Sequence, residues 1–224
     1  MSRAVGVAAL AALTLLATST AAQAHYVYEK ELTYYEDPEL SETPVCTEGR
    51  SEVSHGNGGG FSKSTVYSHT KDFDHLIRCG WDRYVPAGWI GSLETIWKWT
   101  GTEWAVCFDT GWRFNTATQW KTDFSRYWNV PCGPGFYGVT ANGYVWDEEW
   151  DEWRGGSVWS GYHELAGDGF AASASRAPKA PPWVKNGVVD VSKVPALVAS
   201  TTPDGSRTAH SVFAPPPNRP AARR

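Results

Sequence analysis

The 224-residue sequence lacks the features of a membrane protein or a metal-thiolate protein. After residue 24 it has no apolar run of the roughly 20 residues that a helix needs to span a bilayer, so we expect no transmembrane helix there. Only four cysteines are present, and they form no close C-x-x-C pair, which argues against a zinc site. The motifs G-x-S-x-G and H-E-x-x-H are absent, so neither a serine hydrolase nor a zinc metalloprotease is indicated.

Residues 1–24 have the three parts of a secretory signal peptide. A positive start at Arg3 precedes an apolar run, and the segment ends in Ala22-Gln23-Ala24, an A-x-A cleavage signal. A membrane anchor is the alternative, but the apolar run is too short for it. We therefore expect a secreted, extracellular mature protein, with association with the cell wall as a further option.

Charge and aromatic content divide the rest of the chain into two parts. Residues 25–165 hold 21 Asp+Glu, 11 Lys+Arg and 12 of the 13 Trp, whereas residues 166–224 hold 3 Asp, 8 Lys+Arg and 9 of the 14 Pro. The acidic part, with a net charge of −10, argues against nucleic acid as a partner. We predict a folded domain over 25–165 and a basic, mostly disordered tail over 166–224, in which a short apolar segment near 183–199 docks transiently.

The cysteines predict two disulfides, because an even number in an exported chain is typical of a disulfide framework. The residues are Cys46, Cys79, Cys107 and Cys132. Of the three possible pairings we favour Cys46–Cys79 with Cys107–Cys132, which closes loops of ordinary length. Each bond would stabilise the fold by about 3–4 kcal/mol.

Short β-prone runs separated by turn residues follow one another along the domain. Apolar and polar residues alternate on both sides of a Gly-containing turn in residues 92–108, which predicts a β-hairpin. Residues 135–146 and 156–162 look like two more strands, and residues 119–128 fit a helix or a strand, with aromatic content favouring the strand. We predict an all-β fold, either an antiparallel β-sandwich or a partly open barrel.

The density of Trp is the first candidate for function, since exposed indoles stack on sugar rings or fill protein interfaces. Trp150 and Trp153 lie in or beside the acidic segment 147–152, where a loop would leave them exposed. Together with the neighbouring Trp146 and Trp159 they form the predicted ligand-binding set. The alternative is that these rings form core and cross-strand pairs.

The same acidic segment holds five carboxylates, which suggests either a weak Ca²⁺ site or the acid/base pair of a glycosidase. The D-x-D-x-D-G pattern of calcium loops is absent, and spacing on one loop does not show two carboxylates facing each other. A solvated acidic loop is therefore the favoured interpretation, and no cofactor is predicted.

His25 is the most specific candidate for a metal ligand. Cleavage after Ala24 would make it the N-terminal residue, whose amine and imidazole chelate Cu(II) as in copper polysaccharide monooxygenases. The second ligand would be one of four other histidines: His55, His69, His75 and His163. A separate cluster of His69, Asp72, Asp74 and His75 is a second candidate for metal binding, with an exposed polar turn as the favoured alternative.

Three sequence segments are similar to those of a known group of proteins: SEVSHGNGGG at 51–60, PCGPGFYG at 131–138 and GGSVWSGYH at 155–163. They resemble small, Trp/Tyr-rich secreted actinobacterial proteins to which no activity is assigned. The resemblance covers residues 26–165 and implies a secreted domain without indicating a mechanism.

These observations favour a non-enzymatic extracellular protein that binds a glycan, a cell-wall polymer or another protein through exposed Trp and Tyr. The alternatives are a secreted enzyme, using copper at His25 or the carboxylates of the acidic segment, and a secreted antagonist or toxin-like factor.

Overall fold

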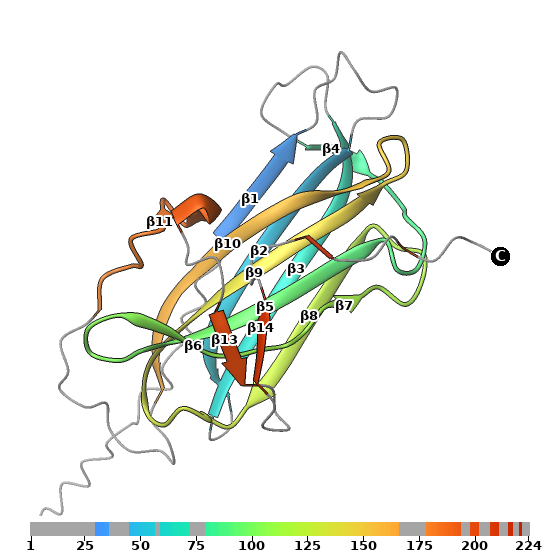
Figure 1. Ribbon diagram of the computed structural model, residues 1–224. Coiled ribbons are helices and arrows are strands. Elements are labelled where there is room, and N and C mark those ends of the chain that lie inside the picture. The colour runs from blue at the N-terminus through green and yellow to red at the C-terminus, as the bar shows by residue number, and fades with distance from the viewer. Residues whose placement is uncertain are drawn as a thin grey trace, which may run out of the picture.

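The computed structural model describes residues 30–35, 45–56, 59–71, 79–165, 178–193, 198–201, 207–210, 215–216 and 220 (Figure 1). This part of the chain is all-β with antiparallel pairing, and its helical content is one 3-10 turn, η2 (Val191–Lys193). Within the same residues, no helix has the length and apolar character needed to cross a membrane.

The first sheet has the strand order β1-β2-β3-β4, and β8 also pairs with β3. Its strands are β1 (Lys30–Tyr35), β2 (Val45–Gly56), β3 (Gly59–Lys71), β4 (Cys79–Asp82) and β8 (Lys121–Trp128). The strand β8 resolves the ambiguous segment in favour of a strand, because its burial alternates along most of its length as the period of a half-buried strand requires.

The second sheet has the order β11-β12-β10-β9-β5-β6, with β7 on β5. Its strands are β5 (Ile90–Trp99), β6 (Trp104–Asp109), β7 (Arg113–Phe114), β9 (Gly135–Asp147), β10 (Glu152–Leu165), β11 (Val184–Lys185) and β12 (Val188–Val189). The predicted hairpin of residues 92–108 is confirmed as β5 and β6, and the two further predicted strands are β9 and β10. A separate hairpin of β13 (Val198–Thr201) and β14 (Arg207–His210) lies against β6.

The two large sheets are stacked on each other and are not closed into a barrel (Figure 1), which confirms the all-β prediction in its sandwich form. Two apolar clusters fill the space between them. One contains Val53, Ile96 and Tyr137, and the other contains Val66 and Ile90. Since strands alternate their side chains, β5, β9 and β10 also carry a second, outer face that points away from this core.

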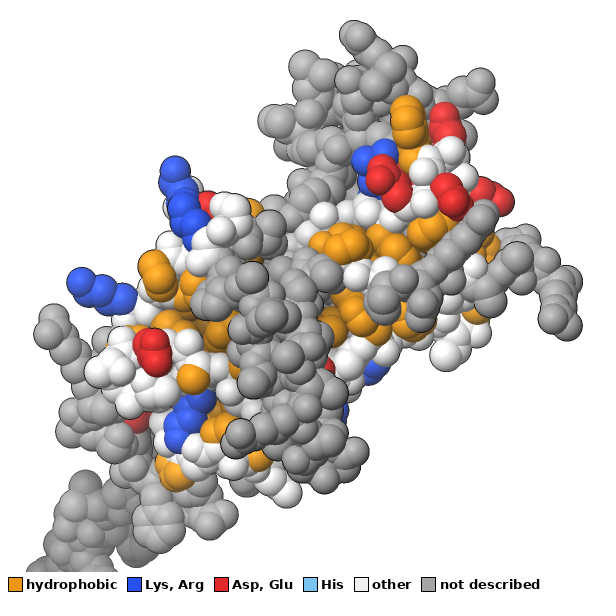
Figure 2. All heavy atoms as spheres, viewed as in Figure 1, with side chains coloured by type: hydrophobic (Ala, Val, Ile, Leu, Met, Phe, Trp, Pro, Cys, Tyr) orange, Lys and Arg blue, Asp and Glu red, His pale blue; other side chains and the backbone are white. Residues whose placement is uncertain are grey.

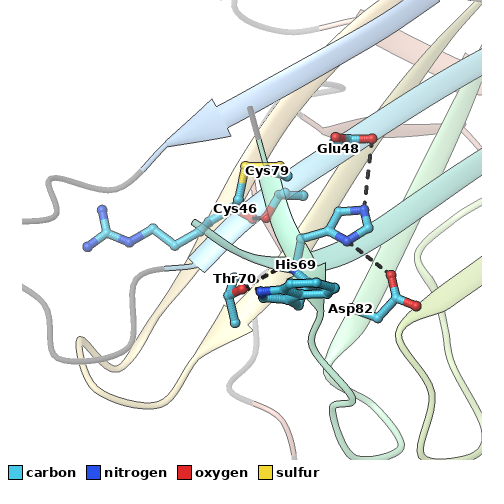
Figure 3. The surroundings of a disulfide bond; sticks show 9 residues. Cys46, Glu48, His69, Thr70, Cys79 and Asp82 are labelled. Atoms are coloured by element: carbon cyan, nitrogen blue, oxygen red, sulfur yellow. Dashed lines mark hydrogen bonds and ion pairs between the residues drawn. A yellow bond between two sulfur atoms is a disulfide. The ribbon is translucent and has the colours of Figure 1, made fainter. Parts of the chain in front are cut away.

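Both predicted disulfides are present. Cys46 of β2 is bonded to Cys79 of β4 with a Cα–Cα distance of 5.4 Å (Figure 3), and Cys107 of β6 is bonded to Cys132 before β9 at 6.0 Å. The first bond ties two strands of one sheet, and the second ties an edge strand to the chain that enters the central strand β9.

Part of the tail is built into the body, so the expected boundary near residue 166 does not separate the two. Residues 178–193 add β11 and β12 to the second sheet, where the backbone N–H of Trp159 donates to the carbonyl of Gly187 at 2.9 Å. Trp183 is only 5% exposed and packs with Trp97 and Trp159 at centroid distances of 4.9 and 5.6 Å. This segment corresponds to part of the apolar stretch that we expected to dock.

Candidate functional site

The four predicted Trp ligands lie in different environments. Trp146 and Trp159 are buried, at 5% and 3% exposure, so neither ring is exposed as the prediction required. Trp150 is 43% exposed, as predicted for the acidic segment, and Trp153 is half-buried. Trp153 is less exposed than expected because the acidic segment is a tight turn between β9 and β10, in which Asp147 pairs with Glu152. Trp153 follows this turn and belongs to β10.

The outer face of the second sheet carries a continuous row of five aromatic rings, which we name the aromatic strip. It consists of Trp112, Phe114, Tyr144, Trp146 and Trp153. Adjacent ring centroids are 5.8 Å apart for Tyr144–Trp112, 6.3 Å for Trp112–Phe114, 5.8 Å for Phe114–Trp153 and 5.4 Å for Trp153–Trp146. These distances are those of interacting aromatic pairs.

Strand register explains why the strip forms. Tyr144 and Trp146 are two residues apart in β9 and therefore share a face, and Trp153 lies directly opposite Trp146. Phe114 is opposite Gly91, which is opposite Tyr144. A Cβ on Gly91 would lie 3.0 Å from Cε1 of Phe114, so the glycine allows the Phe114 ring to lie across β5.

The strip is partly open to solvent. Phe114 is 38% exposed, Trp112 and Trp153 are half-buried, and the rings of Tyr144 and Trp146 are buried among them. In Figure 2 hydrophobic side chains gather over the strands of the second sheet, with carboxylates nearby. One pair of these rings is stacked and the others meet tilted or edge to face. A row of contacting rings with three accessible members is a surface on which the apolar face of a ligand can lie.

The turn beside the strip is held by its own charges. The carboxylate of Asp147 is 1% exposed and accepts the backbone N–H of Glu149 at 3.0 Å. Arg154 lies 3.7 Å from Asp147 and 2.5 Å from Glu152, and its guanidinium is 5.7 Å from the Trp150 ring centroid. Two of the five carboxylates considered for calcium or glycosidase chemistry are thus paired with one arginine that fixes the turn.

Several residues of the histidine hypotheses lie outside the described part of the chain. They are His25, Asp72, Asp74 and His75, together with the side chain of His55. The copper proposal at His25 therefore stays a prediction. Among the described side chains, no group of three or more His, Cys, Asp or Glu is placed to hold a metal ion.

His69 is described, and it lies between two carboxylates near the Cys46–Cys79 bond (Figure 3). Its Nδ1 is 3.4 Å from Asp82 and its Nε2 is 3.9 Å from Glu48, while its ring stacks on Tyr67 and contacts Trp120 at centroid distances of 5.8 and 5.7 Å. The imidazole of β3 thus lies between carboxylates of β2 and β4 and packs against two aromatic rings.

Glu94 is the most enclosed charged residue described, with 0% exposure between the two sheets. Burial raises the pKa of its carboxyl group, while Arg113, at 3.1 Å, and hydrogen bonds from Ser62 and Ser64 act in the opposite direction. Because the carboxyl group is sealed from solvent, its role is to join the two sheets rather than to meet a substrate.

Comparison with models of protein families, with curated proteins and with solved structures finds no match. The resemblance noted for residues 26–165 therefore stays a prediction. The sequence did not point to Trp112, Phe114 or Tyr144 as site residues. Tyr144 shares a face with Trp146 by simple alternation, whereas Phe114 and Trp112 reach the strip through a pairing with β5 that no local pattern indicates.

Proposed function

We propose that this chain is a secreted, non-enzymatic protein that binds a neutral glycan on the aromatic strip. The single observation that carries the proposal is the unbroken row of five contacting aromatic rings on the outer face of the second sheet. Aromatic rings offer large, rigid, amphipathic contact area, and the C–H faces of sugar rings stack on them. An extended strip suits consecutive sugar units of a chain.

Charge favours an uncharged glycan over an acidic one. Residues 25–165 carry a net charge of −10, so the body would repel an acidic polysaccharide at low ionic strength.

The two disulfides support the extracellular part of the proposal, because such bonds persist in oxidising compartments. Residues 166–224 carry a net charge of +5, which would attract anionic cell-wall polymers by an interaction that weakens with salt.

Retention of the full mature chain on insoluble cellulose, chitin and xylan tests the proposal, with polygalacturonate as the acidic comparison. We expect retention on at least one neutral polymer and a loss of affinity of about tenfold, or 1.4 kcal/mol, for Phe114→Ala and for Trp153→Ala. Trp81→Ala is the matched control, since Trp81 is 85% exposed but lies in β4 of the first sheet. Absence of retention on every neutral polymer, or equal losses in all three variants, would refute glycan binding by the strip.

A further inference from the structure

A pocket of about 600 Å³ lies at the end of β5 away from the strip. It is formed between the β5–β6 turn and the chain that leads from Cys132 into β9, and its walls include Lys98, Trp99, Val106 and Phe136. The volume is within the range of pockets that bind small organic molecules. Gly91, which lies beneath Phe114 of the strip, and Lys98 of the pocket are near opposite ends of the same strand, so the two sites are separate.

The walls of the pocket are fixed by covalent and aromatic contacts. The Cys107–Cys132 disulfide is part of the lining and joins its two sides. The hydroxyl of Tyr137 donates to the carbonyl of Gly133 at 2.5 Å, which holds the chain before β9. Trp99 packs on Trp104 at a centroid distance of 5.6 Å. The pocket is therefore formed before any ligand arrives.

One cation lies in this otherwise apolar and backbone-lined space. Lys98 is the only charged side chain among the lining residues, and its ammonium group donates to the carbonyl of Cys132 and lies 5.9 Å from the Tyr137 ring centroid. The side chain passes beside two glycines: a Cβ on Gly133 would be 3.4 Å from Nζ and a Cβ on Gly135 would be 3.4 Å from Cε, both at van der Waals distance. No carboxylate of the described chain forms an ion pair with Lys98.

We infer that this pocket binds a small organic monocarboxylate with an apolar or aromatic body. The ammonium group has three N–H donors, of which the Cys132 carbonyl takes one, so donors remain for a carboxylate. Trp99, Phe136 and the disulfide supply an apolar wall for the rest of the molecule. A single lysine beside a carbonyl oxygen suits a charge of −1 better than the higher charge of a phosphate, which proteins usually hold with several donors.

Titration of the full mature chain with phenylacetate, followed by the indole N–H signals in NMR spectra, tests the inference. We expect saturable binding that shifts the signal of Trp99 and leaves that of Trp153 in place. The neutral analogue phenylacetamide and inorganic phosphate should each bind at least tenfold more weakly. Absence of saturable binding, a shift at Trp153 instead of Trp99, or equal binding of all three compounds would overturn the inference.

Two kinds of variant locate the binding. Lys98→Met should weaken phenylacetate binding at least tenfold and Lys98→Arg should retain it, whereas Lys185→Met, at an exposed lysine of β11, should bind as the parent does. Val106→Phe fills the pocket without touching the charge and should also abolish binding, which keeps the test decisive if Lys98→Met fails to fold. Unchanged binding in Val106→Phe or in a folded Lys98→Met would overturn the proposed site.

Discussion

Replacement of Trp183 by Ala tests whether the C-terminal segment is part of the folded core. The Trp183 side chain is 5% exposed and lies against Trp97 and Trp159. A buried indole removes about 200 Å² from water, which at about 25 cal/mol per Å² corresponds to about 5 kcal/mol as an upper value. Measured truncations of buried Phe or Trp cost about 3–5 kcal/mol, and we expect Trp183→Ala to lower the free energy of unfolding by that amount.

Urea unfolding followed by tryptophan fluorescence and by far-UV circular dichroism measures this change. Val188→Ala is the control on the same segment, because Val188 is 37% exposed and its truncation should cost less than about 1 kcal/mol. If Trp183→Ala were no more destabilising than Val188→Ala, residues 178–193 would not be docked in solution, and the second sheet would end at β10.

Three further changes test the interior. Burial raises the pKa of Glu94 above its usual value of 4.5. The stabilisation that comes from protonated Glu94 is therefore complete below that pH and is lost as the pH rises through the folded-state pKa. In urea unfolding between pH 4.5 and 8, Glu94→Gln should gain stability relative to the parent as the pH rises. Gly138→Ala places a methyl group against the ring of Trp159 and should cost about 1–3 kcal/mol in urea unfolding. Replacement of Cys107 and Cys132 together by Ser should cost about 3–4 kcal/mol and lower the midpoint of thermal unfolding.

Each of these three has its own contradicting result. A constant difference between Glu94→Gln and the parent across the pH range would show that Glu94 does not bind its proton more tightly in the folded state. Gly49→Ala is the control for Gly138→Ala, since a Cβ on Gly49 meets nothing within 4 Å; equal costs would mean that the Trp159 contact is not responsible. An unchanged thermal midpoint in the double serine variant would argue that the Cys107–Cys132 bond does not stabilise the fold.

Local pattern was sufficient to predict much of the fold. The β5–β6 hairpin follows from alternation around a Gly-containing turn, and the disulfide pairing follows from loop length. A segment near 183–199 was expected to dock transiently, but the stable burial of Trp183 was not predicted. Its burial depends on rings of β5 and β10 that lie far away in the sequence.

The candidate site was predicted less well, and the reason is the outer face of the second sheet. Alternation identifies the two faces of a strand, but it indicates the buried face only when the other face is open to water. Both faces of β5 and β9 are largely buried, so Trp146 could not be assigned to core or surface from its position. Trp150 was predicted correctly as exposed because a tight turn has no second layer to cover it.

The late position of Trp183 in the chain has a consequence for the order of events during synthesis. Trp183 follows Trp159 by 24 residues, so at about 5–20 residues per second it is made about 1–5 seconds later. Throughout that interval the nascent chain holds Trp97 and Trp159 without the indole that covers them in the finished protein. A chain that ends before Trp183 would therefore keep these two rings without their covering indole, whereas a chain that extends to Val189 supplies the indole together with β11 and β12.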